Sequence, residues 1–333
     1  MALKGMTLSL PDTGPLCDCL RFGAVALFLF VAIILVPNHA YAPLNHATAL
    51  VTGCLLGTTG ATPLVQGAMV TLGDFKAEII TECTGIYLVA LFLAFVVTCP
   101  ATSMARAVGM MLGIPFLFAA NMLRLAGVIA IGARWPGLFD YAHVYLAQVM
   151  MVVLVCAACL AWSRWASKAS TADTPFDFLA RFAAMASCLF IAWLPIHHGY
   201  VALLDRMVIY LFSLIDYRLF IPLLPDIYHH TLSLLVFASL VCASRGIGMG
   251  RKALGLLAGL LGLMLVHVLF RVTHVLLTAF HMGSILGVHR TIHVVNQYLL
   301  PVIFWLAIIR QGRASSAGPA RSAAAGPRPE KTP

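Results

Sequence analysis

Three residues whose side chains can act together chemically lie at the ends of apolar segments. Cys83 lies in the sequence Glu-Cys-Thr-Gly, Arg124 ends the sequence Asn-Met-Leu-Arg, and His143 ends the sequence Tyr-Ala-His. A thiol, a permanent cation and an imidazole are the groups that a nucleophile, a charge stabiliser and a proton carrier require. Ionisable groups in membrane segments are costly, so a functional explanation is the default for them. These three residues are the candidate catalytic set.

Composition predicts the class of protein. The chain has 333 residues, of which 61% are hydrophobic and 10% are charged, and its mean hydropathy is +0.95. Such a chain is a polytopic helical membrane protein surrounded by lipid. The net charge of +9 does not indicate a nucleic-acid partner, because the basic residues lie in short loops and in the tail rather than in one patch. This distribution is typical of a multi-pass protein of the cell (inner) membrane.

We expect an all-α bundle of about eight membrane-spanning helices. The predicted spans are 22–37, 84–98, 107–132, 143–162, 178–195, 231–244, 253–280 and 293–309. The stretch 46–58 is short and rich in Gly and Thr, so we place it at the outer interface. The stretch 199–215 is only mildly apolar and is harder to assign. The first span is expected to be an uncleaved signal anchor, because Pro43 would obstruct cleavage after Ala42.

The loop charges support this topology. With the N-terminus inside, the loop at Arg106, the linker 163–181 and the loop 245–252 are all basic and cytoplasmic. The outer loop 133–142 carries one Arg and one Asp. If 46–58 crossed the membrane, this bias would be lost. The same topology places all three candidate catalytic residues near the extracytoplasmic face.

The chemistry suggested by the three residues is that of a thiol protease. A nearby cation such as Arg124 favours the thiolate of Cys83, or stabilises the oxyanion of a tetrahedral intermediate. His143 can take the thiol proton and return it to the leaving amine. An arginine then stands where thiol proteases use Asn or Asp. Taken singly, each residue also has a structural explanation, such as packing for the thiol and snorkelling for Arg124.

In these motifs the chain resembles the exosortase/archaeosortase family, whose PEP-CTERM-type members act as sorting transpeptidases. The resemblance covers about residues 20–165 and includes the stretch 72–79 that leads into the cysteine. It implies a membrane-embedded cysteine transpeptidase or protease that cleaves C-terminal sorting signals of exported proteins. Such a signal is a short motif, a transmembrane helix and a basic tail. The resemblance implies Cys83 as nucleophile, His143 as base and acid, and Arg124 as charge stabiliser. It implies no cofactor or metal. It leaves open the recognised motif, and whether an amine-bearing acceptor or water resolves the thioester.

The second half of the chain is similar to the first in its pattern of residues. Arg251, Arg271 and His293 follow Arg106, Arg124 and His143 at intervals of about 145 to 150 residues, and the position matching Cys83 falls near 228–230, without a cysteine. This pattern favours two parallel four-helix repeats, although two Leu-rich halves also align by chance. We expect an exosortase-like catalytic domain at 1–165, a degenerate repeat or accessory membrane domain at 175–310, and a disordered basic cytoplasmic tail at 311–333.

Two alternatives belong to other classes of protein. His267, His274 and His281 recur every seven residues on one helix face, and His289 and His293 follow. Histidines in a bundle can ligate haem or a transition metal, which would make the C-terminal half a haem- or metal-binding module. The other alternative is a membrane transporter with a polar site at the midplane. It is disfavoured because the three candidate catalytic residues lie near one face and membrane-embedded Asp and Glu are scarce.

Overall fold

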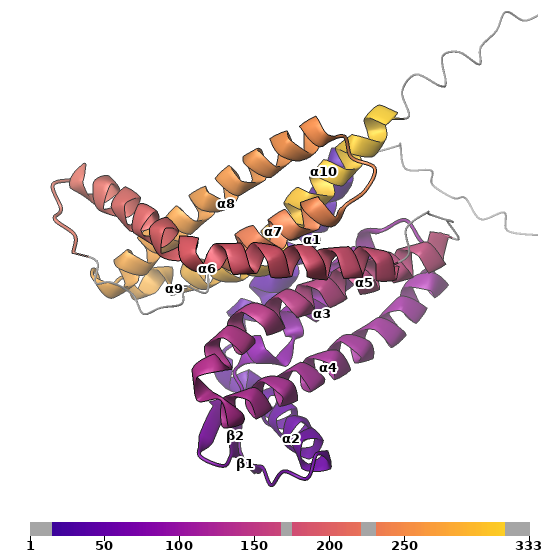
Figure 1. Cartoon of the computed structure of the whole chain (residues 1–333), viewed down its shortest axis with the longest axis vertical. Coiled ribbons are helices and arrows are strands. Elements are labelled where there is room, and N and C mark those ends of the chain that lie inside the picture. Colours follow the sequence, from indigo (N-terminus) through magenta and orange to yellow (C-terminus); the bar gives the residue numbers. More distant parts are fainter. Residues whose placement is uncertain (1–14, 168–174, 221–230, 317–333) are drawn as a thin grey trace, which may run out of the picture.

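The computed structural model describes residues 15–167, 175–220 and 231–316, and helices make up most of this part of the chain (Figure 1). The helices are α1 (Pro15–Leu35), α2 (Ala42–Thr58), α3 (Ile86–Thr98), α4 (Ser103–Arg134), α5 (Ala147–Ser167), α6 (Pro175–Ser213), α7 (Leu232–Ala243), α8 (Met249–Thr278), α9 (Leu286–Val294) and α10 (Leu300–Ser316). The strands are β1 (Leu64–Gln66), β2 (Met69–Leu72) and β3 (Phe75–Glu78). The predicted helical bundle is confirmed.

Within the described residues, five helical segments are long and apolar enough to cross a membrane, or six if the bent pair α1 and α2 counts as one span. The bend between α1 and α2 is 99°. Two further apolar helices, α3 and α7, are shorter, so the count of eight spans stays a prediction. The predicted span 178–195 and the stretch 199–215 form one helix, α6, of 39 residues that contains Pro195. Helix α10 continues to Ser316, and the rest of the predicted tail lies outside the described residues.

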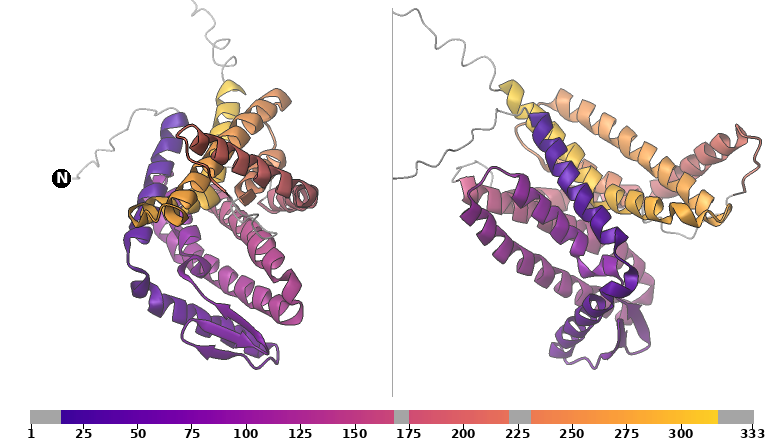
Figure 2. Two further views of the ribbon diagram at one scale, coloured as in Figure 1. Left: turned by 90° about the vertical axis from the view of Figure 1, so that its left-hand side faces the viewer. Right: turned by 180° about the vertical axis from the view of Figure 1, so that it is seen from behind.

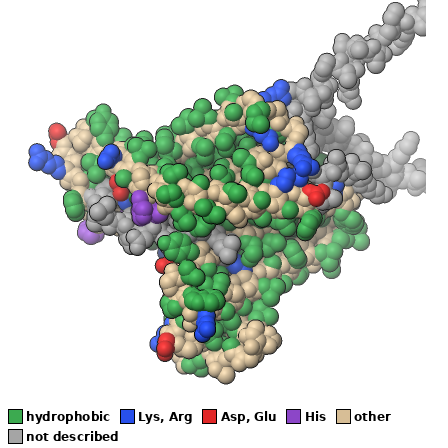
Figure 3. Space-filling view, viewed as in Figure 1, with side chains coloured by type: hydrophobic (Ala, Val, Ile, Leu, Met, Phe, Trp, Pro, Cys, Tyr) green, Lys and Arg blue, Asp and Glu red, His purple; other side chains and the backbone are tan. Residues whose placement is uncertain are grey.

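Hydrophobic side chains cover the long helices on the face drawn in Figure 3, and most charged side chains gather near the ends of the molecule. This is the surface expected for helices in lipid, where backbone polar groups are bonded within each helix and apolar side chains face outward. Many large apolar side chains are accordingly exposed, including Phe28, Leu112 and Leu265.

A small antiparallel sheet, which the sequence did not lead us to expect, lies between α2 and α3 in the chain. Its order is β1-β2-β3, with Val65 opposite Val70 and Val70 opposite Ala77. The turn between β2 and β3 begins at Gly73, whose φ is +60°. A two-residue turn with a positive φ at its first position requires glycine and fits the twist of a hairpin. The sheet packs against α2 and α4.

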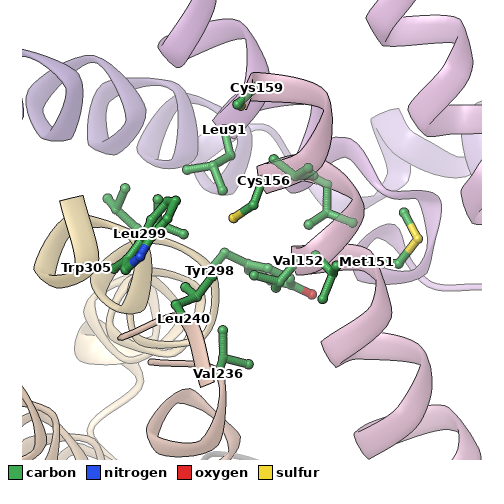
Figure 4. Packing of buried hydrophobic residues seen from close by; sticks show 14 of the residues in the cluster. Leu91, Met151, Val152, Cys156, Cys159, Val236, Leu240, Tyr298, Leu299 and Trp305 are labelled. Carbon is green, nitrogen blue, oxygen red and sulfur yellow. The ribbon is translucent and has the colours of Figure 1, made fainter. Parts of the chain in front are cut away.

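The two halves of the chain are packed together in a reciprocal way. Helix α1 packs against α3 of its own half and against α10 of the other half, and Figure 2 shows α1 beside α10. Helix α6 likewise packs against α7 of its own half and against α5 of the other. One buried apolar core contains side chains from all of these helices, and Figure 4 shows its centre around Tyr298, Cys156 and Leu240. The halves are therefore joined by a continuous core.

The same close contacts recur in both halves at an interval of about 146 residues. Glycines on α4 and α8 allow a large side chain to approach the helix backbone, in the pairs Gly109 with Trp162, Gly113 with Phe92, Gly255 with Ile308 and Gly259 with Phe237. A basic side chain near the start of each helix donates to a carbonyl at the end of the helix before it. These bonds run from Arg106 to the Cys99 carbonyl and from Lys252 to the Ser244 carbonyl.

The approach of Trp162 to Gly109 gives a stability prediction. A Cβ added at Gly109 would lie 2.2 Å from Nε1 of Trp162, the atom that donates to the Ala105 carbonyl at 2.9 Å. The Gly109→Ala variant should therefore lose about 1–3 kcal/mol of stability, because the ring must move. Thermal unfolding in detergent measures this effect. Gly127→Ala, on the exposed side of the same helix with nothing within 4 Å, is the matched control and should not be destabilised.

Candidate active site around Cys83

Cys83 lies in a short turn that connects the sheet to the apolar helix α3. After β3, residues Thr81–Thr84 form a 3₁₀ turn, and Gly85 precedes α3 with a φ of +81°. A left-handed residue at this position lets the chain change direction, and glycine adopts this conformation without a steric penalty. Two hydrogen bonds hold the turn: Cys83 N donates to the Ile80 carbonyl at 2.9 Å, and Thr84 Oγ1 donates to the Thr81 carbonyl at 2.7 Å. The thiol is thus attached to well-supported backbone at the start of α3.

Asn121 connects Cys83 to Arg124. Its Nδ2 donates to the carbonyl oxygen of Cys83 at 2.7 Å, and its Oδ1 accepts from Nη1 of Arg124 at 3.0 Å. Asn121 is fully buried, and its side chain also lies against Gly85, where a Cβ would be 3.2 Å from the amide carbon. Residues three apart on a helix share a face, so α4 presents Asn121 and Arg124 together. The structure therefore brings two of the three predicted site residues, Cys83 and Arg124, into one cluster.

The surroundings of Cys83 are mostly apolar. Its side chain is 7% exposed and packs in a small core formed by α2, the sheet and α4, with Ala49, Leu56, Val70, Ile79, Met122, Leu125 and Ile129. Burial raises the pKa of the Cys83 thiol above its ordinary value, and the carboxylate of Glu82 acts in the same direction. The cation of Arg124 and the backbone at Ile80 act in the opposite direction but do not cancel the effect of burial. A thiol in this state needs a proton acceptor before it can attack.

One hydrogen-bond donor of Arg124 is not used within the described part of the chain. Its Nε is buried, and among the described residues this atom has no hydrogen-bond partner. Buried donors are nearly always paired in native structures, so one without a partner at a candidate site calls for a specific explanation. A negatively charged oxygen of a bound substrate or intermediate would satisfy it.

His143 lies on a π-helical segment, Tyr141–Leu146, between α4 and α5. Its ring stacks on Phe139 with centroids 5.3 Å apart, and Phe139 in turn packs against Phe75 of β3 with centroids 4.8 Å apart. Phe75 and Phe139 both lie against Gly132, near the end of α4. His143 thus lies near the end of α4 that packs against the sheet. Aromatic contacts through Phe139 and Phe75 connect it to β3, the strand that leads to Cys83.

The bridging role of Asn121 gives a second prediction. Asn121→Ala removes both the donor to the Cys83 carbonyl and the acceptor for Arg124, so turnover should fall by about 10²-fold through misplacement of the reacting groups. Asn45→Ala on α2 is the control, because Oδ1 of Asn45 has no partner among the described residues. Steady-state kinetics of purified variants measures the effect. If Asn121→Ala turns over as fast as the unmodified protein, Asn121 has no role in positioning the reacting groups.

The predicted histidine face of the second half is held by hydrogen bonds. His267 is fully buried, with Nδ1 2.7 Å from the Tyr200 hydroxyl and Nε2 2.9 Å from Oγ of Ser233, which donates to Oδ1 of Asn296 at 3.2 Å. The predicted match for Arg124, Arg271, forms an ion pair with Asp205 at 2.7 Å. These polar side chains stabilise one another in the interior.

The other histidines of that half do not build a metal centre with these groups. His289 stacks on Phe270 with centroids 4.4 Å apart and bonds to Oγ1 of Thr273 at 2.9 Å. His293 also lies against Phe270, at 5.8 Å. Within 15–167, 175–220 and 231–316, no group of three or more His, Cys, Asp or Glu side chains could hold a metal ion. The geometry therefore gives no support to the haem or metal alternative. The position that matches Cys83 lies outside the described residues.

Sequence reasoning gave Asn121 no role of its own, although it stands in the motif with Arg124. The available signal was the spacing, because a polar residue three positions before an arginine shares its helix face. The sheet that supports the cysteine was also missed. Its strands have three or four residues each, and β3 alternates apolar and polar side chains over four residues only, whereas β1 and β2 do not alternate.

Comparison with curated proteins and with solved structures gave no match. The family model described as transmembrane exosortase matches residues 17–146, the segment that contains Cys83, Asn121, Arg124 and His143. The predicted resemblance, expected over about 20–165, is thereby confirmed over 17–146, and with the apolar helices it supports a multi-pass membrane protein. The chain is similar, over the segment that builds the site, to the transmembrane exosortases.

Proposed function

We propose that this protein is a membrane-embedded cysteine transpeptidase or protease that cleaves C-terminal sorting signals from exported proteins. The observation that carries the proposal is the hydrogen-bonded chain from the Cys83 carbonyl through Asn121 to Arg124, inside the segment similar to exosortases. A buried thiol beside a cation with an unused donor is suited to attack on a carbonyl and to stabilisation of the resulting oxyanion.

The proposed reaction has two steps, formation and resolution of a thioester on Cys83, and His143 and Arg124 assist them. His143 takes the proton of the Cys83 thiol, and the thiolate attacks the scissile carbonyl carbon. The carbonyl electron pair moves to oxygen, where Arg124 stabilises the negative charge. The C–N bond then breaks, the nitrogen takes the proton from His143, and the transmembrane helix with its basic tail leaves as an amine. An amine acceptor or water next loses a proton to His143 and attacks the thioester carbon, the C–S bond breaks, and the departing sulfur takes that proton to restore the Cys83 thiol.

The side of the membrane on which the substrate meets the site is proposed from the positions of the charged residues. Arg106, Arg164, Arg181, Arg251 and Lys252 lie near the ends of helices that we assign to the cytoplasmic side, and Cys83 lies at the opposite end of α3 from Arg106. The site then faces the extracytoplasmic side of the inner membrane, which an exported substrate reaches after translocation. The recognised partner is an exported protein whose signal helix stays in the lipid beside this bundle.

A co-expression assay tests the proposal. A tagged exported reporter carries a C-terminal motif, a transmembrane helix and a basic tail, and a second reporter lacks the motif. We expect a smaller product only from the first reporter and only when the protein is present. Mass spectrometry of the new C-terminus then distinguishes an amide, formed by transfer, from a carboxylate, formed by hydrolysis. Absence of cleavage with a panel of such motifs would contradict the proposal.

We further propose that residues 175–310 repeat the fold of 1–165 as a non-catalytic copy. The recurring glycine contacts, the paired basic side chains at the helix starts and the reciprocal packing of α1 with α10 and of α6 with α5 support this assignment. Reciprocal contacts of this kind are what an approximate two-fold axis produces. In the copy, Arg271 donates to the carboxylate of Asp205, whereas Arg124 donates to the neutral amide of Asn121.

A further inference from the structure

Strand β3 forms one edge of the small sheet and leads directly to the cysteine. Because the order of the strands is β1-β2-β3, Phe75–Glu78 pair with β2 on one side only. The turn that carries Cys83 begins three residues later, at Thr81. Unpaired backbone groups at the edge of a sheet bind other extended chains, so natural proteins usually cover or shorten such edges. The edge at β3 is therefore a candidate interaction surface.

The register determines which backbone groups of β3 face away from the sheet. Ile79 N donates to the Ala68 carbonyl at 2.9 Å, so these two residues form a hydrogen-bonded pair. Bonded and non-bonded pairs alternate along an antiparallel ladder. Ala77 therefore bonds toward β2, whereas the N–H and C=O groups of Lys76 and Glu78 point away from it. Within the described part of the chain these outward groups have no hydrogen-bond partner, and both side chains are exposed.

The opposite edge of the sheet, at β1, is partly covered by α2. Val65 of β1 packs closely on α2, where a Cβ added at Gly53 would lie 2.6 Å from Cγ2 of Val65. His46 of α2 also bonds through Nδ1 to the Gly67 carbonyl at 2.7 Å, in the turn after β1. In addition, β1 is the strand at the other side of the sheet from β3. The two edges are thus not equivalent.

The edge at β3 lies beside the proposed reacting groups. Cys83 follows β3 in the chain, and Phe75 of β3 contacts Phe139, on which the ring of His143 stacks. The strand has only four residues, so its edge fits a short extended segment rather than a folded domain. The substrate of the proposed function carries such a segment, namely the short motif that precedes its membrane helix.

We propose that the motif of the substrate binds in extended form along the outer edge of β3, as an added strand. The outward N–H groups of Lys76 and Glu78 donate to carbonyl oxygens of the motif. This inference rests on the proposed function. Backbone bonds of this kind supply affinity, and the side chains of the added strand supply specificity. Because side chains alternate along a strand, every second side chain of the motif then lies on the exposed face that carries Lys76 and Glu78.

Proline variants at the outward positions test the proposal without breaking the sheet. Lys76→Pro and Glu78→Pro each remove an N–H that faces away from β2, and proline is tolerated at such edge positions. On the reporter that is cleaved in the co-expression assay, we expect KM to rise about 3- to 10-fold, the effect of losing one hydrogen bond. A bond made equally in the bound substrate and in the transition state affects KM alone, so kcat should change little. Melting temperature and the rate of Cys83 alkylation by iodoacetamide check that the site is still folded.

The matched control places proline at the opposite edge of the same sheet. Val65 lies opposite Val70, which bonds toward β3, so the N–H of Val65 also points away from β2. Val65→Pro should leave KM unchanged. Lys76→Ala keeps the backbone N–H, and a rise of KM equal to that of Lys76→Pro would overturn the inference, because the side chain would then be responsible.

An unchanged KM in both Lys76→Pro and Glu78→Pro would likewise overturn the inference and leave the cysteine mechanism intact. If these variants instead abolish a dimer that the unmodified protein forms on size-exclusion chromatography, with KM unchanged, the edge pairs with a second copy of the chain. That result also contradicts a role in substrate binding.

A measurement on the substrate side does not depend on the folding of any variant. Synthetic peptides of the cleaved reporter, with motif and membrane helix, carry an N-methyl group on one motif amide at a time. Methylation should raise KM at alternate amides, those that face β3, and not at the amides between them. An effect without this alternation would overturn the inference. If the unmodified protein cleaves no reporter at all, the proposed function fails and this inference fails with it.

Discussion

The Cys83→Ala variant should leave the exported reporter uncut, with a loss of turnover of at least on the order of 10³-fold. Removal of a nucleophile eliminates the covalent pathway, and only the weak contribution of binding and charge stabilisation remains. The variant should fold, because alanine fits a position packed mainly by apolar side chains of α2, the sheet and α4. Immunoblots of reporter size, with equal membrane levels of both proteins, measure the effect.

The control for this prediction is a second thiol on a neighbouring helix. Cys54 lies on α2 and is exposed, whereas Cys83 is buried. Cys54→Ala should process the reporter at the normal rate. Comparable processing by Cys83→Ala and Cys54→Ala would show that cleavage does not depend on Cys83.

Replacing Arg124 with glutamine should lower turnover by about 10²- to 10³-fold. Glutamine can still bond to Asn121, but it carries no charge for the oxyanion. The same change should also shift the titration of the thiol. Arg124 lowers the pKa of Cys83 against the effect of burial, so its loss raises that pKa further. At any pH below the pKa the thiolate fraction then falls, and the alkylation profile moves to higher pH.

Two measurements check this second prediction, namely steady-state turnover and the rate of iodoacetamide alkylation between pH 6 and 10, a range centred on the ordinary thiol pKa of about 8.5. A background with Cys54→Ala, Cys188→Ala and Cys242→Ala removes the exposed thiols of the described residues. Arg134→Gln is the matched control, since Arg134 is exposed at the end of the same helix. An unchanged alkylation profile in Arg124→Gln would show that Arg124 does not affect the pKa of the Cys83 thiol. A profile shifted to lower pH would show that Arg124 raises this pKa, which contradicts the prediction.

The sequence predicted the features that follow from long-range composition and from helix periodicity. Apolar runs gave helices close to the predicted spans, because a chain in lipid must satisfy its backbone within each segment. The grouping of Cys83 with Arg124 followed from topology, since both were expected at the same face. The motif with Asn at 121 and Arg at 124 also contained the residue that connects Arg124 to Cys83. The spacing alone does not show that the Asn121 amide donates to the Cys83 carbonyl.

Other features depend on tertiary contacts that no local pattern encodes. The short strands that lead into Cys83 are stabilised by packing on α2 and α4, so their sequence carries little strand signal. The join of 178–195 with the following stretch into α6 was missed because that stretch is only mildly apolar. Pro195 lies within the joined helix, where neighbouring helices can support a proline. The approach of Tyr298 to Tyr87 joins residues far apart in the chain, which only the packing of the two halves reveals.

The measurement that tests the central claim most directly is a search for an acyl group on Cys83 during turnover. Purified protein is mixed with excess reporter, quenched in acid within one turnover, and digested for mass spectrometry. The account predicts a burst of released helix and tail, and a hydroxylamine-sensitive thioester on the peptide that contains Cys83. Simultaneous release of both fragments by an active enzyme, with Cys83 unmodified at every quench time, would contradict it.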